Sequence, residues 1–323
     1  MLSTKINKIL VVGASGVIGL NLIKEYTQIN HKMEQYEIHA VSKRPIPNFF
    51  VENFGLKNII YYCSISELED DYFDVIFNCG GPSQPAVFIE NPRLTLDANI
   101  FELDELFQKL SENGKFIQMS TSEIYSGCTE KPCTESHRGI LMPDNPRRVY
   151  VLAKELSELM LETLIKPNQT ILIARVSLVF GPGARLNDKR VLYEFIIKGL
   201  SGRVSIEGSS NSIRRYLYVS DFILMLNLLI SCLPKGFHTY NFCGIEKISI
   251  FEMASKIARI LKVDIDKKIL NDNRSNGAPE EVWVSNAKLV NQVKNFLFTD
   301  FEVGLIHTIE HIKKLSLSDY DSI

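Results

Sequence analysis

Three glycines spaced three residues apart lie between a short apolar run and a helical pattern near the start of the chain. The apolar run, residues 8–12, predicts a buried strand, and residues 20–29 have the periodicity of an amphipathic helix. A glycine turn in that setting lets the backbone approach a pyrophosphate, whose charge is favoured by free amides at the helix N-terminus. The turn therefore predicts a dinucleotide site, with a purely structural turn as the alternative. The expected cofactor contacts in it are Gly13, Ser15, Gly16, Val17, Ile18 and Gly19.

Short apolar runs alternate with longer amphipathic stretches along most of the chain. This alternation is typical of parallel strands that are buried on both faces and connected by helices. We therefore predict an α/β fold, a Rossmann-type doubly wound parallel sheet with a smaller C-terminal substrate-binding lobe. The expected strands are 8–12, 37–41, 58–62, 75–79, 115–119, 170–176 and 239–243. The expected helices are 20–29, 94–110, 150–165 and 222–233.

The pattern changes after Gly181-Pro182-Gly183, where the chain becomes less regular and richer in charge. We predict a dinucleotide-binding Rossmann domain over residues 1–181 and a mainly substrate-binding lobe over residues 182–323. The apolar run at 239–243 is expected to return to the sheet of the first domain.

The end of the second predicted strand bears on which dinucleotide the turn accepts. An Asp or Glu about twenty residues after the glycines is typical of sites that bind the ribose hydroxyls of NAD. Here Ser42, Lys43 and Arg44 follow Val41, with no acid among them. A hydroxyl and two cations suit the 2′-phosphate of NADP, so the sequence favours NADP, although NAD stays open. A solvated basic turn before Pro45 is the alternative.

Composition and charge exclude several classes of protein. The chain has 36 Lys and Arg against 38 Asp and Glu, a balance that does not suit binding to nucleic acid or an anionic membrane. The longest apolar stretch, residues 222–233, is shorter than the roughly 18 residues that suggest a bilayer span. The chain starts with polar residues and only a short apolar run follows, so no signal peptide is expected. Six scattered cysteines without a CxxC pair indicate a reducing cytoplasm.

Two residues four apart on a predicted helix, Tyr150 and Lys154, form a candidate acid–base pair. Positions i and i+4 share a helix face, so both side chains can point into one cleft. A phenol with an ordinary pKa of about 10 is a poor base at neutral pH, and a neighbouring ammonium lowers that pKa. An amphipathic helix with a solvated lysine is the alternative.

Four segments, in this order and together with the glycine turn, make the chain resemble the extended short-chain dehydrogenase/reductases, in particular the NAD(P)-dependent nucleotide-sugar epimerase/dehydratase family. The segments are Met119-Ser-Thr-Ser-Glu-Ile-Tyr125, Tyr150-Val-Leu-Ala-Lys154, Arg175-Val-Ser-Leu-Val-Phe-Gly-Pro182 and Arg214-Arg-Tyr-Leu-Tyr-Val-Ser-Asp221. The resemblance implies that Tyr150 exchanges the proton of a sugar hydroxyl as hydride moves to or from nicotinamide, while Thr121 holds the same oxygen. It also implies a homodimer, or a dimer of dimers, built by pairing helices that include residues 150–165.

The resemblance assigns site residues along the chain. The implied catalytic residues are Thr121, Ser122, Glu123, Tyr150 and Lys154. Further implied cofactor contacts are Cys79, Gly80, Gly81, Asn99, Tyr150 and Lys154. The implied substrate contacts are Pro82, Ser83, Ser177, Arg190, Glu207, Arg214 and Arg274.

Ser122 and Glu123 bear most on the reaction. They resemble the Ser-Glu pair of GDP-mannose 4,6-dehydratases and UDP-glucuronate decarboxylases, whereas dTDP-glucose 4,6-dehydratases have Asp-Glu. The segment from Gly80 to Pro92, with Asn99 beyond it, also resembles the decarboxylases. We expect hydride transfer at carbon 4 of a nucleotide-linked sugar by a dehydrogenase/4-ketoreductase. The alternative functions are a 4-epimerase, a decarboxylase or dehydratase that uses Glu123, and a non-catalytic NAD(P) sensor. For Glu123 itself, the alternative is that it only caps or anchors its segment.

Three positions depart from the family pattern. Ser177 stands where Asn is common, Glu207 where an aromatic residue is common, and Glu102 where a Gly-Thr pair begins. A carboxylate at Glu207 would accept from the N–H donors of guanine and would disfavour uracil and thymine. A solvated Glu207 is the alternative.

The sequence His307-Thr-Ile-Glu-His311 matches a zinc-peptidase pattern. Zinc catalysis would need a third ligand in a polar cleft. Ile306, Ile309 and Ile312 instead predict the buried stripe of a terminal helix, so we expect no metal site.

Overall fold

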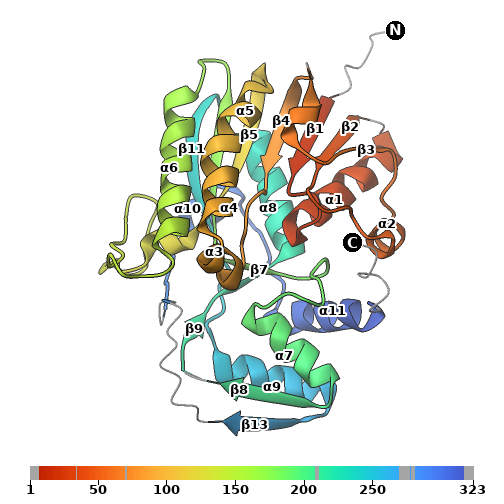
Figure 1. Cartoon of the computed structure of the whole chain (residues 1–323), viewed down its shortest axis with the longest axis vertical. Helices are drawn as coiled ribbons and strands as arrows, with labels where there is room; N and C mark the ends of the chain where they lie inside the picture. The colour runs from red at the N-terminus through yellow and green to blue at the C-terminus, as the bar shows by residue number, and fades with distance from the viewer. Residues whose placement is uncertain are drawn as a thin grey trace.

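A seven-stranded sheet forms the centre of the computed structural model, which describes residues 7–33, 35–69, 71–207, 211–268, 277 and 281–315. Its order is β11-β6-β5-β4-β1-β2-β3, and neighbouring strands are parallel throughout (Figure 1). The strands are β1 (Asn7–Val12), β2 (Tyr36–Val41), β3 (Ile59–Tyr62), β4 (Phe73–Asn78), β5 (Leu110–Thr121), β6 (Thr170–Val176) and β11 (Gly236–Phe242). Each overlaps a predicted apolar run, so the prediction of a doubly wound parallel sheet is confirmed. The order reverses between β1 and β4, where open sheets of this kind bind ligands at the carboxyl ends of the strands.

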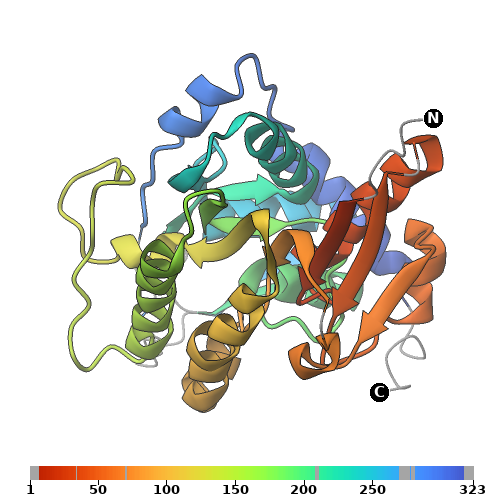
Figure 2. The same cartoon turned by 90° about the horizontal axis from the view of Figure 1, so that it is seen from above.

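Helices cover both faces of the sheet (Figure 2). On one face are α4 (Pro92–Leu96), α5 (Glu102–Gln108) and α6 (Arg148–Leu164), and on the other are α1 (Val17–Met33) and α8 (Val219–Cys232). Leu106 and Leu161 pack with Phe116 in the core of the first face. Ile23 and Phe222 belong to the core of the other face. Burial on both faces explains why the strands are continuous apolar runs and do not alternate with polar residues.

The predicted helix 94–110 is wrong as one regular element. The chain forms α4, a π-helical turn η2 (Asp97–Phe101) and α5, and Leu110 already begins β5. Inside the π turn, the Asn99 side chain donates from Nδ2 to the Thr95 carbonyl oxygen at 2.8 Å. A side chain that bonds into the helical ladder favours such a local widening, and π turns are frequent at functional sites.

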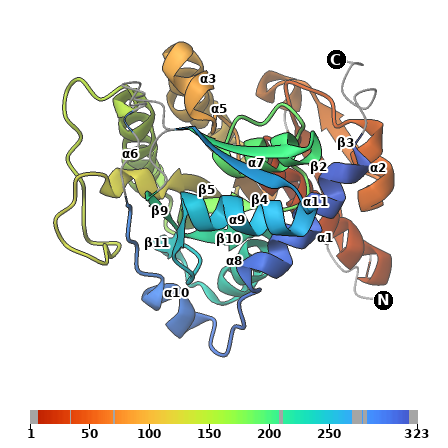
Figure 3. The same cartoon turned by 90° about the horizontal axis from the view of Figure 1, so that it is seen from below.

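A smaller part of the molecule lies below the sheet (Figures 1 and 3). Its strands pair as β8 (Arg203–Glu207) with β13 (Asp264–Lys268), β7 (Leu178–Phe180) with β10 (Tyr216–Tyr218), and β9 (Ile213–Arg214) with β12 (Ile248–Ser249). Its helices are α7 (Val191–Leu200) and α9 (Ile250–Leu261), and α9 begins with a capping box between Ser249 and Glu252. The chain leaves the smaller part at β11 to pair with β6 in the central sheet, and then returns to the smaller part at β12. The division of the chain at residue 181 stays a prediction.

The remaining elements are short or lie at the ends of the described chain. They are α2 (Asn48–Phe54), α3 (Pro85–Glu90), α10 (Ala287–Gln292), α11 (Phe301–Lys314) and the 3-10 turns η1 (Ile65–Leu68) and η3 (Ser122–Tyr125). None of the helices in the described ranges has the length and apolar character needed to cross a membrane. All six cysteines are free thiols.

Candidate active site

The glycine turn packs against the carboxyl ends of two strands and leaves no room for a side chain at Gly13 or Gly19. Gly13 has a φ of 75°, and a Cβ added there would lie 2.5 Å from the Cys79 carbonyl oxygen. A Cβ added at Gly19 would lie 2.4 Å from the Gly13 carbonyl oxygen. The Gly13 amide donates to the Val41 carbonyl oxygen at 3.0 Å, which ties the turn to the end of β2. Such a turn fits the backbone approach to a pyrophosphate. Ser15 and Gly16 complete the turn, and α1 begins at Val17 and Ile18.

The basic residues after β2 are not equivalent. Lys43 Nζ donates to Glu102 Oε1 at 2.7 Å, so a carboxylate on α5 neutralises its charge. Arg44 is exposed. The Ser42 hydroxyl donates to the Ser15 hydroxyl at 2.7 Å and joins this strand end to the glycine turn. We expected both cations to bind a 2′-phosphate. Because Lys43 is paired with Glu102, only Arg44 keeps this expectation.

The end of β4 faces the π turn. A Cβ added at Gly81, whose φ is 99°, would lie 3.3 Å from Asn99 Nδ2, so Gly81 and Asn99 are in close contact. Asn99 is buried, and its Oδ1 has no hydrogen-bond partner within the described residues. An acceptor without a donor in a buried site fits a ligand that brings a hydroxyl or amide. Cys79 and Gly80 connect β4 to this contact.

Lys154 is buried on the face of α6 that packs on β5. Its Nζ donates to the Met119 carbonyl oxygen at 2.7 Å. Burial lowers the pKa of Lys154 to about 8, although the Cys79 thiol and the Glu158 carboxylate act in the opposite direction. The ammonium is therefore largely protonated at neutral pH and can release its proton slightly above it.

Tyr150 lies on the same helix, one turn before Lys154, and its ring stacks on Phe88 with centroids 4.4 Å apart and planes 6° apart. Burial raises the pKa of Tyr150 to about 12, and the Glu123 carboxylate acts in the same direction. A hydrogen bond with the Thr121 side chain and the guanidinium of Arg147 lower this pKa. The predicted pair and Thr121 are thus brought together.

Glu123 has a partner that sequence reasoning missed. Its Oε1 forms a short ion pair with Arg147 Nη1, while its Oε2 is buried with no hydrogen-bond partner within the described residues. The Glu123 amide donates to Thr121 Oγ1 at 3.1 Å, so Thr121 also caps η3, in which Ser122 is buried. Arg147 precedes Tyr150 by three residues, a helical spacing that could have revealed it.

Two predicted substrate arginines lie in the same neighbourhood. The guanidinium of Arg190 lowers the pKa of Tyr150. The same guanidinium forms a fork with Asp188, in which Nε donates to Oδ1 at 3.0 Å. Burial lowers the pKa of Arg214; Tyr216 and Glu123 oppose this effect and Arg147 adds to it. Lys154, Arg147, Arg190 and Arg214 together give the site an excess of positive charge.

The other predicted substrate residues are less informative. Pro82 and Ser83 lie between β4 and α3, and Ser83 is exposed. The Ser177 hydroxyl donates to the Arg215 carbonyl oxygen at 3.1 Å. Glu207 is the last residue of β8, where its backbone pairs with Lys268, and its predicted preference for guanine stays a prediction. Arg274 lies outside the described residues.

The two histidines of the zinc-like pattern contact protein groups. His311 Nε2 accepts from the Gly183 amide at 3.0 Å, and its ring packs against Phe50 and Phe54. Burial lowers the pKa of His311 to about 4. His307 Nδ1 lies 3.3 Å from the Tyr218 hydroxyl. His311 therefore anchors α11 to the core, and the exposed His307 contacts Tyr218 at the surface.

The parallel sheet, the glycine turn and the buried tyrosine–lysine pair define a Rossmann-fold enzyme that uses a nicotinamide dinucleotide. The model of the NAD dependent epimerase/dehydratase family matches residues 9–243, and the chain belongs to this family of enzymes.

Relatives and solved structures of similar proteins agree with this assignment. UDP-glucuronic acid decarboxylase 1 of Xenopus tropicalis is 26% identical over 315 residues, which cover 95% of this chain and 72% of the relative. UDP-glucuronic acid decarboxylase 6 of Arabidopsis thaliana is 26% identical over 294 residues, which cover 88% of this chain and 82% of the relative. The fold is similar to that of UDP-glucose 4-epimerase from Thermotoga maritima, solved with UDP-glucose, with a TM-score of 0.78, 21% identity and coverage of 95% and 99% of the two chains. It is also similar to UDP-glucuronic acid 4-epimerase from Bacillus cereus, solved with UDP-glucuronic acid and NAD, with a TM-score of 0.77, 22% identity and coverage of 96% and 100%.

Proposed function

We propose that the enzyme transfers hydride between a nicotinamide dinucleotide and carbon 4 of a nucleotide-linked sugar. The observation that carries this proposal is the buried Tyr150, with the Thr121 side chain lowering the pKa of its phenol and Lys154 one helical turn away. The bound dinucleotide supplies the hydride acceptor. Tyr150 accepts the proton of the sugar hydroxyl and Thr121 holds the same oxygen, so that a C–H and an O–H bond are replaced by a carbonyl.

The charges around Tyr150 support its role as the base. With a pKa of about 12 before ligands bind, the phenol alone would be protonated at neutral pH. Lys154, whose pKa is about 8, is then mostly charged. The guanidiniums of Arg147 and Arg190 lower the phenol pKa, and the Lys154 ammonium with the positive ring of an oxidised nicotinamide would lower it further toward the working range.

The excess of positive charge supports an anionic substrate. Arg147, Arg190 and Arg214 act electrostatically on Tyr150 or Glu123, and the carboxylates of Glu123 and Asp188 offset only part of their charge. Guanidinium forks suit the oxygens of a diphosphate or of a carboxylate. A nucleoside diphosphate that carries a sugar acid has both groups.

A second candidate step, loss of CO2 from a nucleotide-linked uronic acid, is favoured by the Glu123–Arg147 pair. Oxidation at carbon 4 turns the carboxylate on carbon 5 into that of a β-keto acid, so the C–C bond breaks as its electron pair moves into the carbonyl. Arg147 can hold that carboxylate, and Glu123 can relay a proton from water to carbon 5, where the electron pair left by CO2 forms the new C–H bond. The decarboxylases of Xenopus tropicalis and Arabidopsis thaliana carry out this reaction by name. Return of the hydride to carbon 4 completes the cycle.

Conversion of UDP-glucuronic acid in heavy water tests both steps. We expect a product that has lost CO2 and carries deuterium at carbon 5. We expect Glu123→Gln to slow its formation by about 10²–10⁴-fold, because a proton-transfer group is lost, while reduced dinucleotide still forms. Mass spectrometry of the product and absorbance of the reduced dinucleotide measure the two events.

The exposed Glu52 on α2 offers a matched control, since Glu52→Gln makes the same chemical change on a helix that carries no site residue. A product of unchanged mass would point to epimerisation, and accumulation of reduced dinucleotide with a ketone would point to a dehydrogenase/4-ketoreductase. Failure to convert any of a panel of nucleotide sugars would show that the proposed function is wrong.

We infer that the preferred dinucleotide is NADP. Support comes from the absence of an acid at Ser42-Lys43-Arg44 and from the exposure of Arg44. Arg44→Ala is expected to weaken NADPH binding by roughly 10- to 100-fold and NADH binding little, because a charged pair with the 2′-phosphate is lost. Lys43→Ala is the matched control, with a smaller loss, because Glu102 already neutralises Lys43. Equal losses of NADH and NADPH affinity in Arg44→Ala, measured by fluorescence titration, would contradict NADP.

We infer that a second copy of the chain covers the outer face of α6. Leu152, Leu156 and Leu159 are exposed along this face, and Leu94 and Phe101 are exposed on the neighbouring α4 and η2. An apolar surface of this extent is typical of a protein interface. Sedimentation equilibrium, with twice the chain mass as the expected result, checks the inference.

A further inference from the structure

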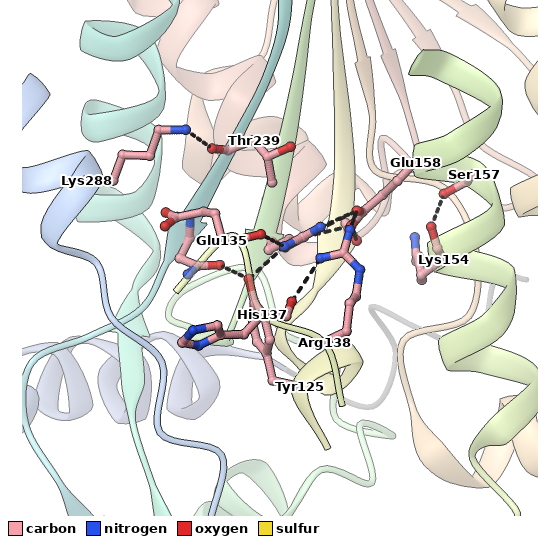
Figure 4. Close-up of polar contacts among 12 residues, drawn as sticks. Tyr125, Glu135, His137, Arg138, Lys154, Ser157, Glu158, Thr239 and Lys288 are labelled. Atoms are coloured by element: carbon pink, nitrogen blue, oxygen red, sulfur yellow. Dashed lines mark hydrogen bonds and ion pairs between the residues drawn. The ribbon is translucent and has the colours of Figure 1, made fainter. Parts of the chain in front are cut away.

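A second buried polar cluster joins Glu158 on α6, through Arg175, to Tyr125 on η3 (Figure 4). Its centre is an ion pair between Glu158 on α6 and Arg175 on β6, which are 5% and 2% exposed. Arg175 Nε donates to Glu158 Oε1 at 3.1 Å, and Arg175 Nη2 donates to Oε2 at 2.7 Å. Two parallel hydrogen bonds of this kind define one orientation of helix against strand.

The same carboxylate also holds the end of β5. The Ser120 hydroxyl donates to Glu158 Oε1 at 2.5 Å, and Ser120 directly precedes Thr121. One helical turn earlier on α6, Lys154 Nζ donates to the Met119 carbonyl oxygen. Two successive turns of α6 are therefore fastened to the two residues that come before Thr121.

The guanidinium extends the cluster to η3. Arg175 Nη1 donates at 2.8 Å to the hydroxyl of Tyr125, the last residue of η3, and at 2.8 Å to the Glu135 carbonyl oxygen. The Tyr125 hydroxyl donates to Asn241 Oδ1 at 2.7 Å, and the Asn241 amide donates to Glu135 Oε1 at 2.9 Å. Both ends of the segment from Ser120 to Tyr125 are thus bonded to this one ion pair.

We propose that Glu158 is a positioning residue, whose bonds to Arg175 and Ser120 set α6 against the end of β5 so that Tyr150 meets Thr121. This inference rests on the proposed function, in which these two hydroxyls share the reacting oxygen. Glu158 itself touches neither substrate nor dinucleotide in this scheme. It acts through the helix that carries Tyr150 and the strand that carries Thr121.

The energetics of buried charges indicate that this ion pair fixes the position of α6 and adds little to the stability of the fold. Removing two charges from water costs about as much as their attraction returns, so a buried pair is a weak stabiliser compared with apolar packing. A displacement of about 1 Å between reacting groups, in contrast, lowers a rate by about 10²-fold. The cluster therefore matters most for the distance between α6 and β5.

Three variants of the full chain test the proposal. We expect Glu158→Gln to lower kcat about 10- to 100-fold, with KM and the dissociation constant of the dinucleotide changed less than about threefold. Ser120→Ala removes the link to β5 but leaves the ion pair, so it should fold normally and lower kcat about 3- to 10-fold. Glu162→Gln makes the same change as Glu158→Gln at an exposed position on the same helix and should leave kcat unchanged.

A spectroscopic readout separates this proposal from the proposed function. The tyrosinate absorbance is measured against pH with oxidised dinucleotide bound. The difference between a protein and the same protein with Tyr150→Phe reports the titration of Tyr150. We expect the pKa of Tyr150 to rise by about half a unit or more in Ser120→Ala, since Thr121, which lowers this pKa, no longer lies correctly against the phenol. Wild-type enzyme that converts no nucleotide sugar would overturn the proposed function alone. An unchanged kcat and an unchanged Tyr150 titration in Ser120→Ala would overturn the positioning role.

Discussion

Tyr150→Phe is expected to lower kcat by at least about 10²–10⁴-fold and to leave dinucleotide binding nearly unchanged. The change removes the phenol oxygen that exchanges the substrate proton. The ring that stacks on Phe88 remains, and the bond between Lys154 and Met119 does not involve Tyr150. Steady-state kinetics and dinucleotide titration measure the two effects separately.

Tyr72, which is 61% exposed, gives the matched control, because Tyr72→Phe removes the same atom from the surface. Its kcat should equal that of the wild type. Retention of more than about a tenth of the wild-type rate by Tyr150→Phe would contradict the assignment of Tyr150 as the acid–base group.

Gly13→Ala is expected to lower the free energy of unfolding by about 2–4 kcal/mol and to weaken dinucleotide binding at least tenfold. Part of the loss comes from the φ of 75°, which disfavours any residue with a Cβ. The rest comes from the backbone, since the new methyl group would lie 2.5 Å from the Cys79 carbonyl oxygen. Relief of this contact would push the turn away from β4, where we expect the pyrophosphate.

Gly55→Ala separates the two causes, because Gly55 has a φ of 63° and open space around its missing Cβ. Its loss should be about 1–2 kcal/mol, with dinucleotide affinity unchanged. Denaturant unfolding and dinucleotide titration of both variants provide the comparison. Equal losses of stability, or tight dinucleotide binding by Gly13→Ala, would show that the turn has room for a side chain and would contradict its role.

The strands of the sheet were predictable because parallel strands buried on both faces must be continuous apolar runs. The run at 239–243 was recognisable for this reason, although it follows a long stretch of less regular chain, and it overlaps β11. The single helix expected over 94–110 was not correct, because its apolar spacing does not reveal that the Asn99 side chain bonds to Thr95 and widens the helix.

The candidate site was predictable where it depends on local spacing. Tyr150 and Lys154 share a face of α6 because they are four residues apart, and the glycine turn follows a strand that ends at Val12. Arg147 was missed as a partner of Glu123, since a basic pair before a helix is more often solvated. Lys43 was expected to face a phosphate, and the carboxylate that holds it belongs to α5.

The sequence by itself determined the buried strands, the glycine turn and the tyrosine–lysine pair, because each depends on residues that are near one another in the chain. Only the tertiary structure decided which charges pair. The pairs join positions separated by 24, 59 and 17 residues: Glu123 with Arg147, Lys43 with Glu102, and Glu158 with Arg175. The free energy of a charge depends on its burial and on its neighbours in space, and neither is contained in the order of residues along the chain.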